Sequence, residues 1–348
     1  MRYKWSPFRH WPMRWRVVAV ATVWLTFISL FHYSFSVEHE KKRIVRLGYM
    51  PVISNLAAPL LDYASRNQGK VRFEAVKFSS FAELGNALRN DQIDAAFMIA
   101  PLSIVLRQQG EEVKVVYIGN RHESTLVARA DLNITRLSQL VGRTVAVPLR
   151  HSGHYLSIHQ LMEDQGLIDQ IKVVEMNPPD MAAALAAGSL DAYYVGEPFA
   201  AKTLRGGIAA RVLYVEEVWP GFICNLAVVK QRLIEKEPAI VELLVEGAVR
   251  SGLWAMHNHQ EAARIASQYW NQPLELIEYA LNTPENRIRY DLFMPKPEEM
   301  QKIADLMVRF HLITNNQIAG LLEDRFAKAA DLDGVTDSNS ILRRSPSP

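Results

Sequence analysis

The sequence lacks most of the residue patterns on which covalent stabilisation and catalysis depend. Its single cysteine, Cys224, excludes a disulfide within the chain and a zinc cluster built from cysteines. No Gly-x-Ser-x-Gly elbow, phosphate-binding glycine loop or dinucleotide fingerprint occurs. The formal net charge is only +2 over 348 residues, which provides no general attraction to nucleic acid. These absences argue against an enzyme and against a nucleic-acid-binding protein.

The histidines and aspartates of the chain do not have the spacings that a metal site or an acid–base pair requires. The clustered histidines lack the i, i+4 pair with an intervening Glu that marks a helical zinc site; they are His151, His154 and His159. Asp94 and Asp191 each come at a strand start, and we expect them to fix the turn that enters the strand rather than to form a converging acid–base pair. We therefore predict no catalytic residue, no cofactor and no metal.

Acidic residues are absent from the N-terminus, where no Asp or Glu precedes Glu38. Five bases occur in the segment 1–16, and 21 uncharged residues follow at 17–37. This length suits a helix that spans a bilayer, and the bases keep its start in the cytoplasm. The alternative is a signal peptide cleaved near residues 34–36. In both cases the remainder of the chain is exported, to a periplasmic location with or without an inner-membrane anchor.

The chain contains an internal repeat at an offset of 97 residues. Residues 87–102, ALRNDQIDAAFMIAPL, are echoed by residues 184–199, ALAAGSLDAYYVGEPF, and Pro51 and Pro148 keep the same offset. Around each copy, helix caps and short apolar runs predict the order βαβαβα, which implies parallel strands with right-handed crossovers. Two copies predict two similar lobes that face each other across a cleft.

The predicted fold class is α/β, with two Rossmann-like lobes joined by two crossing strands and preceded by one apolar helix. We interpret 124–130 and 222–229 as the crossings. Lobe 1 then comprises 44–128 and 223–313, and lobe 2 comprises 129–222. Helices are expected in lobe 1 at 231–257, with a new start at Pro238, and then at 260–270, 273–282 and 297–311. Residues 314–330 are predicted to form a C-terminal helix and 331–348 a disordered tail.

Ligands of open parallel sheets bind outside the carboxyl ends of the strands, which selects six loops. Three belong to lobe 1 (51–55, 78–81 and 100–102) and three to lobe 2 (148–154, 177–179 and 196–199). Helix starts at these loops favour anions or polar groups. The candidate ligand-binding residues are Ser54, Asn55, Ser79, Ser80, Phe81, Pro101, Glu123, Ser152, Gly153, His154, Glu197 and Phe222. The alternative is that the serines only cap helices and that residues 150–154 form an ordinary capped turn.

Several segments, taken in order, resemble the nitrate/sulfonate/taurine-type solute-binding proteins of bacterial ABC importers. They are RLGYMP, FSSFAEL, IDAAFMIAPLS, VGRTVAVP, HSGHYLSIHQLMEDQGL and YYVGEPFAAK, and the likeness covers roughly residues 44–313. The resemblance implies a type II periplasmic-binding-protein fold. It also implies capture of a small solute, delivery to a permease with a cytoplasmic ATPase, and no catalysis by this chain.

The resemblance reproduces the nitrate or bicarbonate site only in part. Phe81 takes the place of a tryptophan that is common in that branch, and Glu123 takes the place of a glutamine, whereas His154 matches the family histidine. A charged residue expected near Pro220 is absent. Glu123 and Glu197 would repel an anion if both faced it ionised. Sulfonates and nitrogenous solutes such as pyrimidines therefore stay open as ligands.

The expected mechanism is a two-state clamp that a solute closes by contacting both lobes. We expect Ser152 and His154 on one side, with Ser79 and Ser80 on the other, to contact the solute. The alternatives are a tethered sensor that acts through a membrane partner, and an enzyme on the same fold.

Overall fold

The computed structural model describes residues 12–37, 42–67 and 69–342, which form two separate units. The first contains helix α1 (Met13–Val37), and its 19-residue stretch Met13–Phe31 is long and apolar enough to cross a membrane. Trp24 and Phe27 are more than 60% exposed, so the helix offers its large side chains to its surroundings. The predicted apolar helix is confirmed, whereas most of the basic segment 1–16 lies outside the described residues.

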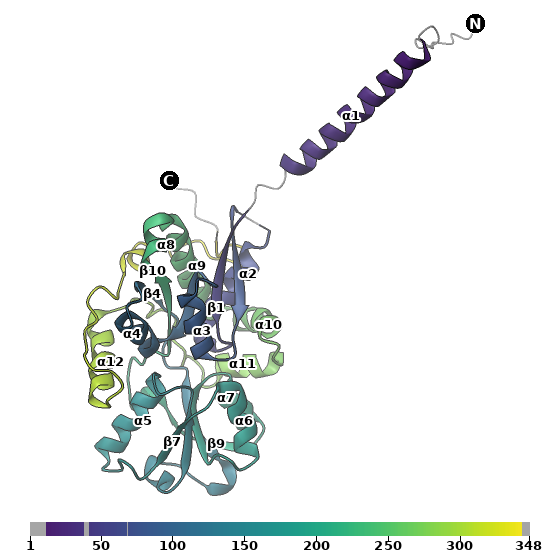
Figure 1. Ribbon diagram of the computed structural model, residues 1–348. Helices are drawn as coiled ribbons and strands as arrows, with labels where there is room; N and C mark the ends of the chain where they lie inside the picture. The colour runs from purple at the N-terminus through teal and green to yellow at the C-terminus, as the bar shows by residue number, and fades with distance from the viewer. Residues whose placement is uncertain (1–11, 38–41, 68, 343–348) are drawn as a thin grey trace. The chain divides into compact units, whose positions relative to one another are not determined.

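The second unit, residues 44–348, is built on two five-stranded sheets (Figure 1). The first sheet, the centre of lobe 1, has the order β2-β1-β3-β10-β4. Strand β10 is antiparallel to both neighbours, whereas β1 and β3 are parallel. The strands are β1 (Arg43–Tyr49), β2 (Val71–Lys77), β3 (Ala95–Ile99), β4 (Val113–Ile118) and β10 (Asn225–Lys230).

The second sheet, the centre of lobe 2, repeats this arrangement with the order β7-β6-β8-β5-β9. Here β5 is the antiparallel strand, and β6 is parallel to β7 and β8. The strands are β5 (Ser124–Arg129), β6 (Thr144–Val147), β7 (Lys172–Glu175), β8 (Ala192–Gly196) and β9 (Ala209–Tyr214). The mixed sheets confirm the predicted α/β class with two similar lobes.

Helices cover both faces of each sheet (Figure 1). Lobe 1 contains α2 (Ala57–Ser65), α3 (Phe81–Arg89), α4 (Ala100–Gln108), α8 (Gln231–Lys236), α9 (Pro238–His257), α10 (His259–Trp270), α11 (Leu274–Asn282), α12 (Pro297–Arg309) and α13 (Arg325–Lys328). Lobe 2 contains α5 (Gly153–Asp164), α6 (Pro178–Ala186) and α7 (Phe199–Arg205). The predicted restart at Pro238 is confirmed, because proline suits the first turn of a helix.

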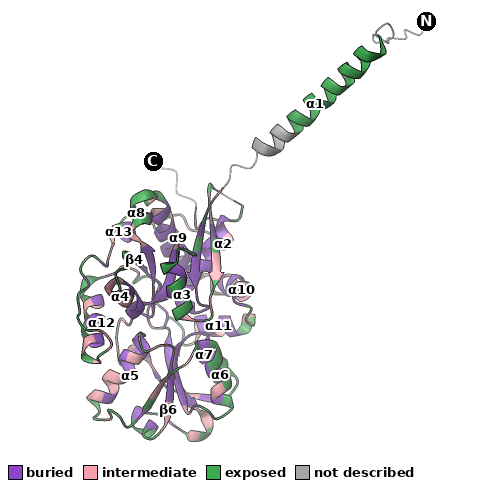
Figure 2. Cartoon of the chain, in the orientation of Figure 1, coloured by how far each residue is buried: buried purple, intermediate pink, exposed green. Residues whose placement is uncertain are grey.

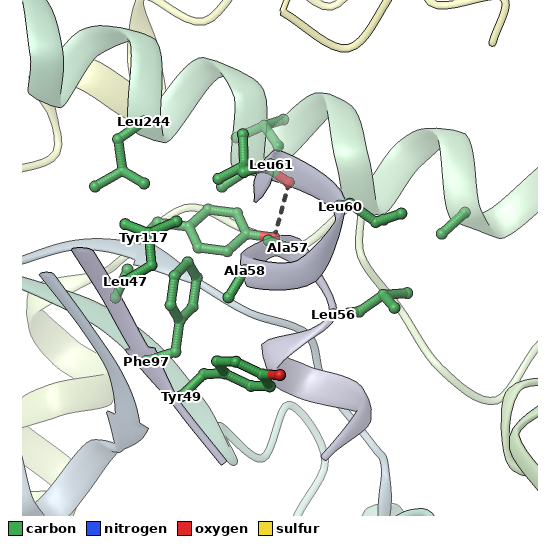
Figure 3. Packing of buried hydrophobic residues seen from close by; sticks show 14 of the residues in the cluster. Leu47, Tyr49, Leu56, Ala57, Ala58, Leu60, Leu61, Phe97, Tyr117 and Leu244 are labelled. Atoms are coloured by element: carbon green, nitrogen blue, oxygen red, sulfur yellow. Dashed lines mark hydrogen bonds between the residues drawn. The ribbon is translucent and has the colours of Figure 1, made fainter. Parts of the chain in front are cut away.

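The core of lobe 1 on the side of α2 and α9 is apolar and aromatic (Figure 3). Phe97 and Tyr117 meet edge to face, with ring centroids 6.5 Å apart. The Tyr117 hydroxyl donates to Ala248 O at 3.3 Å, so this buried polar atom has a partner. Figure 2 shows that the central strands of both sheets are mostly buried, whereas the edge strands β2 and β7 are largely half-buried or exposed.

The paired acids hold equivalent turns in the two lobes, as predicted. Asp94 accepts from Arg46 N at 2.8 Å, and the Asp94 N–H donates to Arg46 O at 2.9 Å. In lobe 2, Asp191 accepts from Thr144 N at 2.9 Å, and its N–H donates to Thr144 O at 3.1 Å. Each aspartate therefore joins the start of one parallel strand to its neighbour.

The offset between the copies is not constant in three dimensions. Phe78 N donates to Tyr49 O, and Met176 N donates to Val147 O, so these strands correspond at an offset of 98. Pro148 thus corresponds to Met50 rather than to Pro51, which corrects the pairing predicted from the sequence. The helix caps Ser80 and Asn177 return to an offset of 97, so lobe 1 has one additional residue, Ser79, in the loop after β2.

The chain passes between the sheets twice, as predicted, but through short segments rather than through the predicted strands. Because β5 and β10 each pair within a single sheet, the passages are residues 119–123 and residues 215–224. Arg121 forms isolated bridges with Ile223 and with Arg289, so the passages lie beside each other and beside a third segment. We propose lobe boundaries within these passages, a few residues before the boundary predicted at 128.

The C-terminal predictions were wrong. Only Arg325–Lys328 is helical between 314 and 330, and residues 331–342 pack against α9 instead of forming a disordered tail. The buried Arg250 guanidinium donates to four backbone carbonyls of that segment, those of Asp331, Asp333, Ser340 and Ile341. The composition of this segment is typical of a loop. A guanidinium has five N–H donors, so it can order such a segment by binding its backbone carbonyls. Residues 343–348 lie outside the described residues.

Candidate functional site

A cavity of about 350 Å³ opens between loops of the two lobes. Four of the six predicted loops contribute to it, namely those after β1, β2, β7 and β8, and the α10–α11 junction forms a further wall. The lining residues are Pro51, Lys77, Phe78, Ser79, Pro179, Pro198, Phe199, Lys202, Trp270, Gln272 and Leu276. The predicted loops after β3 and β6 do not reach it. The cavity therefore lies towards the β2 and β7 edges of the two sheets.

The charged groups of the cavity wall are of one sign. Lys77 ends β2 in lobe 1, and Lys202 lies in α7 of lobe 2. Among the described residues that line the cavity, none is Asp or Glu. Lys77 Nζ donates to Trp270 O at 3.4 Å, which keeps its ammonium group beside the wall. This arrangement favours an anion that contacts both lobes.

Trp270 adds a large, mostly buried aromatic side chain to this wall. Its side chain is only 2% exposed, and its Nε1–H finds no acceptor among the described residues. This nitrogen has almost no accessible surface, so it lies within the protein rather than at the cavity surface. The aromatic and proline side chains around it offer apolar contact to the rest of a ligand.

Half of the polar residues predicted to bind the ligand belong to a second feature, a buried polar cluster between the lobes; they are Ser54, Asn55, Glu123 and Glu197. Ser54 Oγ donates to Glu123 Oε1 at 2.8 Å, and Asn225 Nδ2 donates to Asn55 Oδ1 at 2.9 Å. Across the lobes, Ile53 N donates to Glu197 O at 2.8 Å. Ser54 was predicted to bind the ligand, with helix capping as the alternative; it caps no helix, and its hydroxyl donates to the Glu123 carboxylate. The cluster comprises Ser54, Asn55, Asn120, Glu123, Ser124, Thr125, Glu197, Cys224, Asn225 and Arg287.

The two carboxyl groups of the cluster are held in different ways. Burial raises the pKa of Glu123 to about 7, and hydrogen bonds from Ser54, Cys224 and Asn120 only partly oppose this shift. Burial also raises the pKa of Glu197, but the Arg287 charge opposes it. Glu197 is further occupied by Thr125 Oγ1 at 2.9 Å. Neither carboxyl faces the cavity.

Arg287 is a member of the polar cluster that the sequence analysis missed. It comes from the irregular segment after α11, yet it is 8% exposed and reaches the second sheet. It donates to Thr125 Oγ1 at 3.1 Å and to Glu216 Oε1 at 2.8 Å, and its guanidinium lies 3.6 Å from Glu197. It also lies 4.0 Å over the Tyr214 ring. No motif or helical spacing marks this position, so the sequence alone contains no sign of the contact.

His154 is not at the cavity. Its Nε2 forms a hydrogen bond with Ser124 Oγ at 2.8 Å, and its ring packs edge to face with Tyr194 and Phe222. Burial lowers the pKa of His154 to about 3, so the imidazole is neutral at ordinary pH. Ser152 caps α5 by accepting from Tyr155 N at 3.2 Å. Ser152 therefore caps a helix, as in the alternative in which residues 150–154 form an ordinary capped turn.

The remaining predicted residues are separated from one another. Ser80 caps α3 by accepting from Ala82 N, and Phe81 lies in the core beneath that helix. Pro101 begins α4 and is buried. A side chain at Gly153 would collide with the Phe222 ring, so this glycine allows close packing within lobe 2. Of the twelve predicted residues, the structure places Ser79 alone on the cavity wall, and their roles in binding stay predictions.

A model of the NMT1-like family matches residues 38–269. The taurine-binding periplasmic protein of Escherichia coli K12 is 24% identical over 177 residues, which cover 50% of this chain and 54% of that protein. The chain thus spans about half the length of this relative. A putative aliphatic sulfonates-binding protein of Bacillus subtilis 168 is 21% identical over 305 residues, which cover 84% of this chain and 90% of that protein.

Solved structures share the fold at low sequence identity. The alkanesulfonate-binding protein SsuA of Xanthomonas axonopodis pv. citri, bound to MOPS, has a TM-score of 0.69 and 17% identity, covering 81% of this chain and 98% of that chain. The periplasmic nitrate-binding protein NrtA of Synechocystis PCC 6803 has a TM-score of 0.71 and 16% identity, covering 87% and 85%. These likenesses match both sheets of the chain to one binding-protein fold.

Proposed function

Because this chain belongs to the NMT1-like family, we propose that it is the solute-binding component of an ABC importer. Its relatives are named as a taurine-binding periplasmic protein and a putative aliphatic sulfonates-binding protein. We propose that a small anionic solute binds in the cavity between Lys77 and Lys202. The observation that carries this proposal is that one ammonium group comes from each lobe and that no carboxylate is among the described lining residues.

The contacts across the lobes support a clamp mechanism. The backbone bond from Ile53 to Glu197 and the pairing of both passages at Arg121 hold the lobes together on the side of the polar cluster. A solute that contacts Lys77 and Lys202 together interacts fully only when the lobes are closed. Because a ligand shifts an equilibrium by its differential affinity for the two states, such a solute favours closure.

The N-terminal segment and the family support export of the folded unit and a membrane partner. Helix α1 has the length and composition of a membrane span, preceded by basic residues. We propose that the folded unit works outside the cytoplasm and delivers its solute to a permease with a cytoplasmic ATPase. As a tethered protein it would act at a high effective concentration beside that permease. Uptake of a labelled sulfonate by cells with and without the gene tests this step; equal uptake would contradict it.

Calorimetry on the full-length chain in detergent tests the proposed site. We expect 1-propanesulfonate to bind, and we expect Lys202→Met to weaken binding at least tenfold, about 1.4 kcal/mol. Lys172→Met is the matched control, because this exposed lysine of β7 belongs to the same lobe but does not line the cavity. Absence of binding by any tested sulfonate, nitrate or carboxylate, or equal effects of the two variants, would contradict the proposal.

A further inference from the structure

The charges around the cavity allow the class of solute to be narrowed, on the premise that the proposed binding function holds. Lys77 and Lys202 both carry ammonium groups, and the other polar lining side chains, Ser79, Gln272 and Trp270, are neutral. A zwitterionic solute brings an ammonium group of its own. Inside this wall, that group would meet two like charges and no carboxylate, and it would leave water without a compensating ion pair.

The acids that adjoin the wall in sequence do not supply the missing partner. Asp180 and Glu275, next to the lining residues Pro179 and Leu276, are exposed and do not line the cavity. Glu197 precedes the lining residue Pro198, but its oxygens accept from Thr125 Oγ1 at 2.9 Å and from Ala201 N at 2.7 Å. Glu175 ends β7 two residues before the loop, and its carboxylate lies 3.1 Å from the Arg150 guanidinium. Both carboxylates are therefore engaged away from the cavity.

The remaining wall suits an organic body rather than a bare inorganic ion. Six lining residues offer mainly apolar surface: Pro51, Phe78, Pro179, Pro198, Phe199 and Leu276. A volume of about 350 Å³ corresponds to the liquid volume of roughly ten water molecules. Nitrate, with four heavy atoms and no apolar surface, would leave most of this wall in contact with water. An alkyl or aryl group attached to the anionic head would cover it.

We infer that the cavity selects organic anions that carry an apolar body and no ammonium group, and that it discriminates against zwitterions such as taurine. The anionic head lies between Lys77 and Lys202. The carbon body contacts the proline and aromatic wall. Sulfonate and carboxylate heads share this chemistry, and the lysines, the neutral donors and the apolar wall together set the preference.

A matched pair of ligands tests this selectivity. 1-Propanesulfonate and taurine have the same number of heavy atoms and differ by a methyl in place of an ammonium group. Calorimetry on the full-length chain is expected to give a dissociation constant at least tenfold lower for 1-propanesulfonate. Hexanesulfonate should bind tighter still because it covers more of the apolar wall, and hexanoate tests a carboxylate head.

A charge-reversing variant makes the test independent of absolute affinity. In Lys202→Glu the wall gains a carboxylate, so the preference for 1-propanesulfonate over taurine should fall at least tenfold, whereas Lys172→Glu should leave the ratio unchanged. Lys77→Glu is the second variant if the first does not fold. If taurine binds the wild type as tightly as 1-propanesulfonate, yet Lys202→Met abolishes binding, the selectivity is overturned while the binding function stands. If nitrate binds and no organic anion does, the selectivity alone is overturned; if no anion binds, both are overturned.

Discussion

The two lobes are copies of one design, and they differ most where the parallel strands end. At the strand starts, Asp94 and Asp191 make the same pair of bonds to the neighbouring strand. At the carboxyl ends the copies diverge. Ala100 of lobe 1 corresponds to Glu197 of lobe 2, and Lys77 corresponds to Glu175. The repeated positions therefore build the sheets, whereas the divergent positions determine the charge between the lobes.

Because of this difference, the two lobes contribute different residues to the positively charged wall of the cavity. The strand-end charge of lobe 1, Lys77, lines the cavity, whereas its counterpart Glu175 is paired with Arg150. The additional residue of lobe 1, Ser79, also lines the cavity. In lobe 2 the cavity-facing cation comes from a helix, at Lys202. Similar scaffolds thus present different groups to the same cavity.

The largest expected effect concerns Glu197, the carboxylate of lobe 2 whose counterpart in lobe 1 is Ala100. Arg287→Met leaves Glu197 and Glu216 without their buried cation, so we expect it to lower the free energy of unfolding by about 3–5 kcal/mol. Urea unfolding followed by circular dichroism measures this. Arg289→Met is the control, because that side chain is 44% exposed and pairs with Asp291 at the surface. If Arg287→Met lowers the free energy of unfolding by less than about 1 kcal/mol, Arg287 does not stabilise the buried carboxylates of lobe 2.

The next effect concerns the carboxyl that lies at the passage between the copies. Burial raises the pKa of Glu123 from 4.5 to about 7 in the folded state. The folded state therefore binds the proton more tightly than the unfolded state does. Its stability is expected to fall as the pH rises from about 4.5 through about 7, by up to ~3 kcal/mol, and then to level off.

The variant Glu123→Gln isolates this contribution because glutamine cannot ionise. The free energy of unfolding, measured by urea titration between pH 5 and pH 8, should decline less steeply in this variant than in the wild type. The exposed Glu175→Gln should retain the wild-type slope. Identical slopes for wild type and Glu123→Gln would exclude a buried, protonatable Glu123.

A smaller effect compares the cations that the two lobes contribute. Lys77→Met and Lys202→Met should each weaken binding of 1-propanesulfonate by roughly tenfold, about 1.4 kcal/mol. Each substitution removes one ammonium group from the cavity, Lys77→Met on the side of lobe 1 and Lys202→Met on the side of lobe 2. Titration calorimetry measures both. If one lysine carries the whole effect and the other none, the anion is held by a single lobe and does not draw the lobes together.

The smallest effect tests the equivalence of the strand starts. Asp94→Ala and Asp191→Ala each remove a side-chain acceptor from a backbone N–H, so each should cost about 1 kcal/mol of stability. Thermal unfolding of both variants provides the comparison, with the asparagine variants as controls that keep an acceptor oxygen. A difference of more than about 1 kcal/mol between the two alanine variants would show that the aspartates are not equivalent.

The repeat made much of the fold predictable, because turns, caps and strand starts depend on short stretches of sequence. The roles of Ser80, Ser152 and Asp191 followed from such local patterns. The roles of Ser54 and His154 did not, because each depends on a partner far along the chain, Glu123 or Ser124. Arg287 was missed for the same reason.

The cavity was predictable as a set of loops but not as a set of residues. Four of the six loops line it, yet its charge depends on Lys77 and Lys202, which lie just inside a strand and a helix rather than in the loops. Its third wall, at Trp270, comes from helices outside the repeat. The packed C-terminal segment was likewise unforeseen, since its order depends on the remote Arg250.

A crystal structure of the full-length chain with 3-bromopropanesulfonate would locate the solute directly, because bromine scatters anomalously. We expect one bromine peak against the proline and aromatic wall, with the sulfonate between Lys77 and Lys202 and the two lobes closed around it. A bromine peak within the buried polar cluster, or no bromine peak in this cavity, would contradict the proposed site.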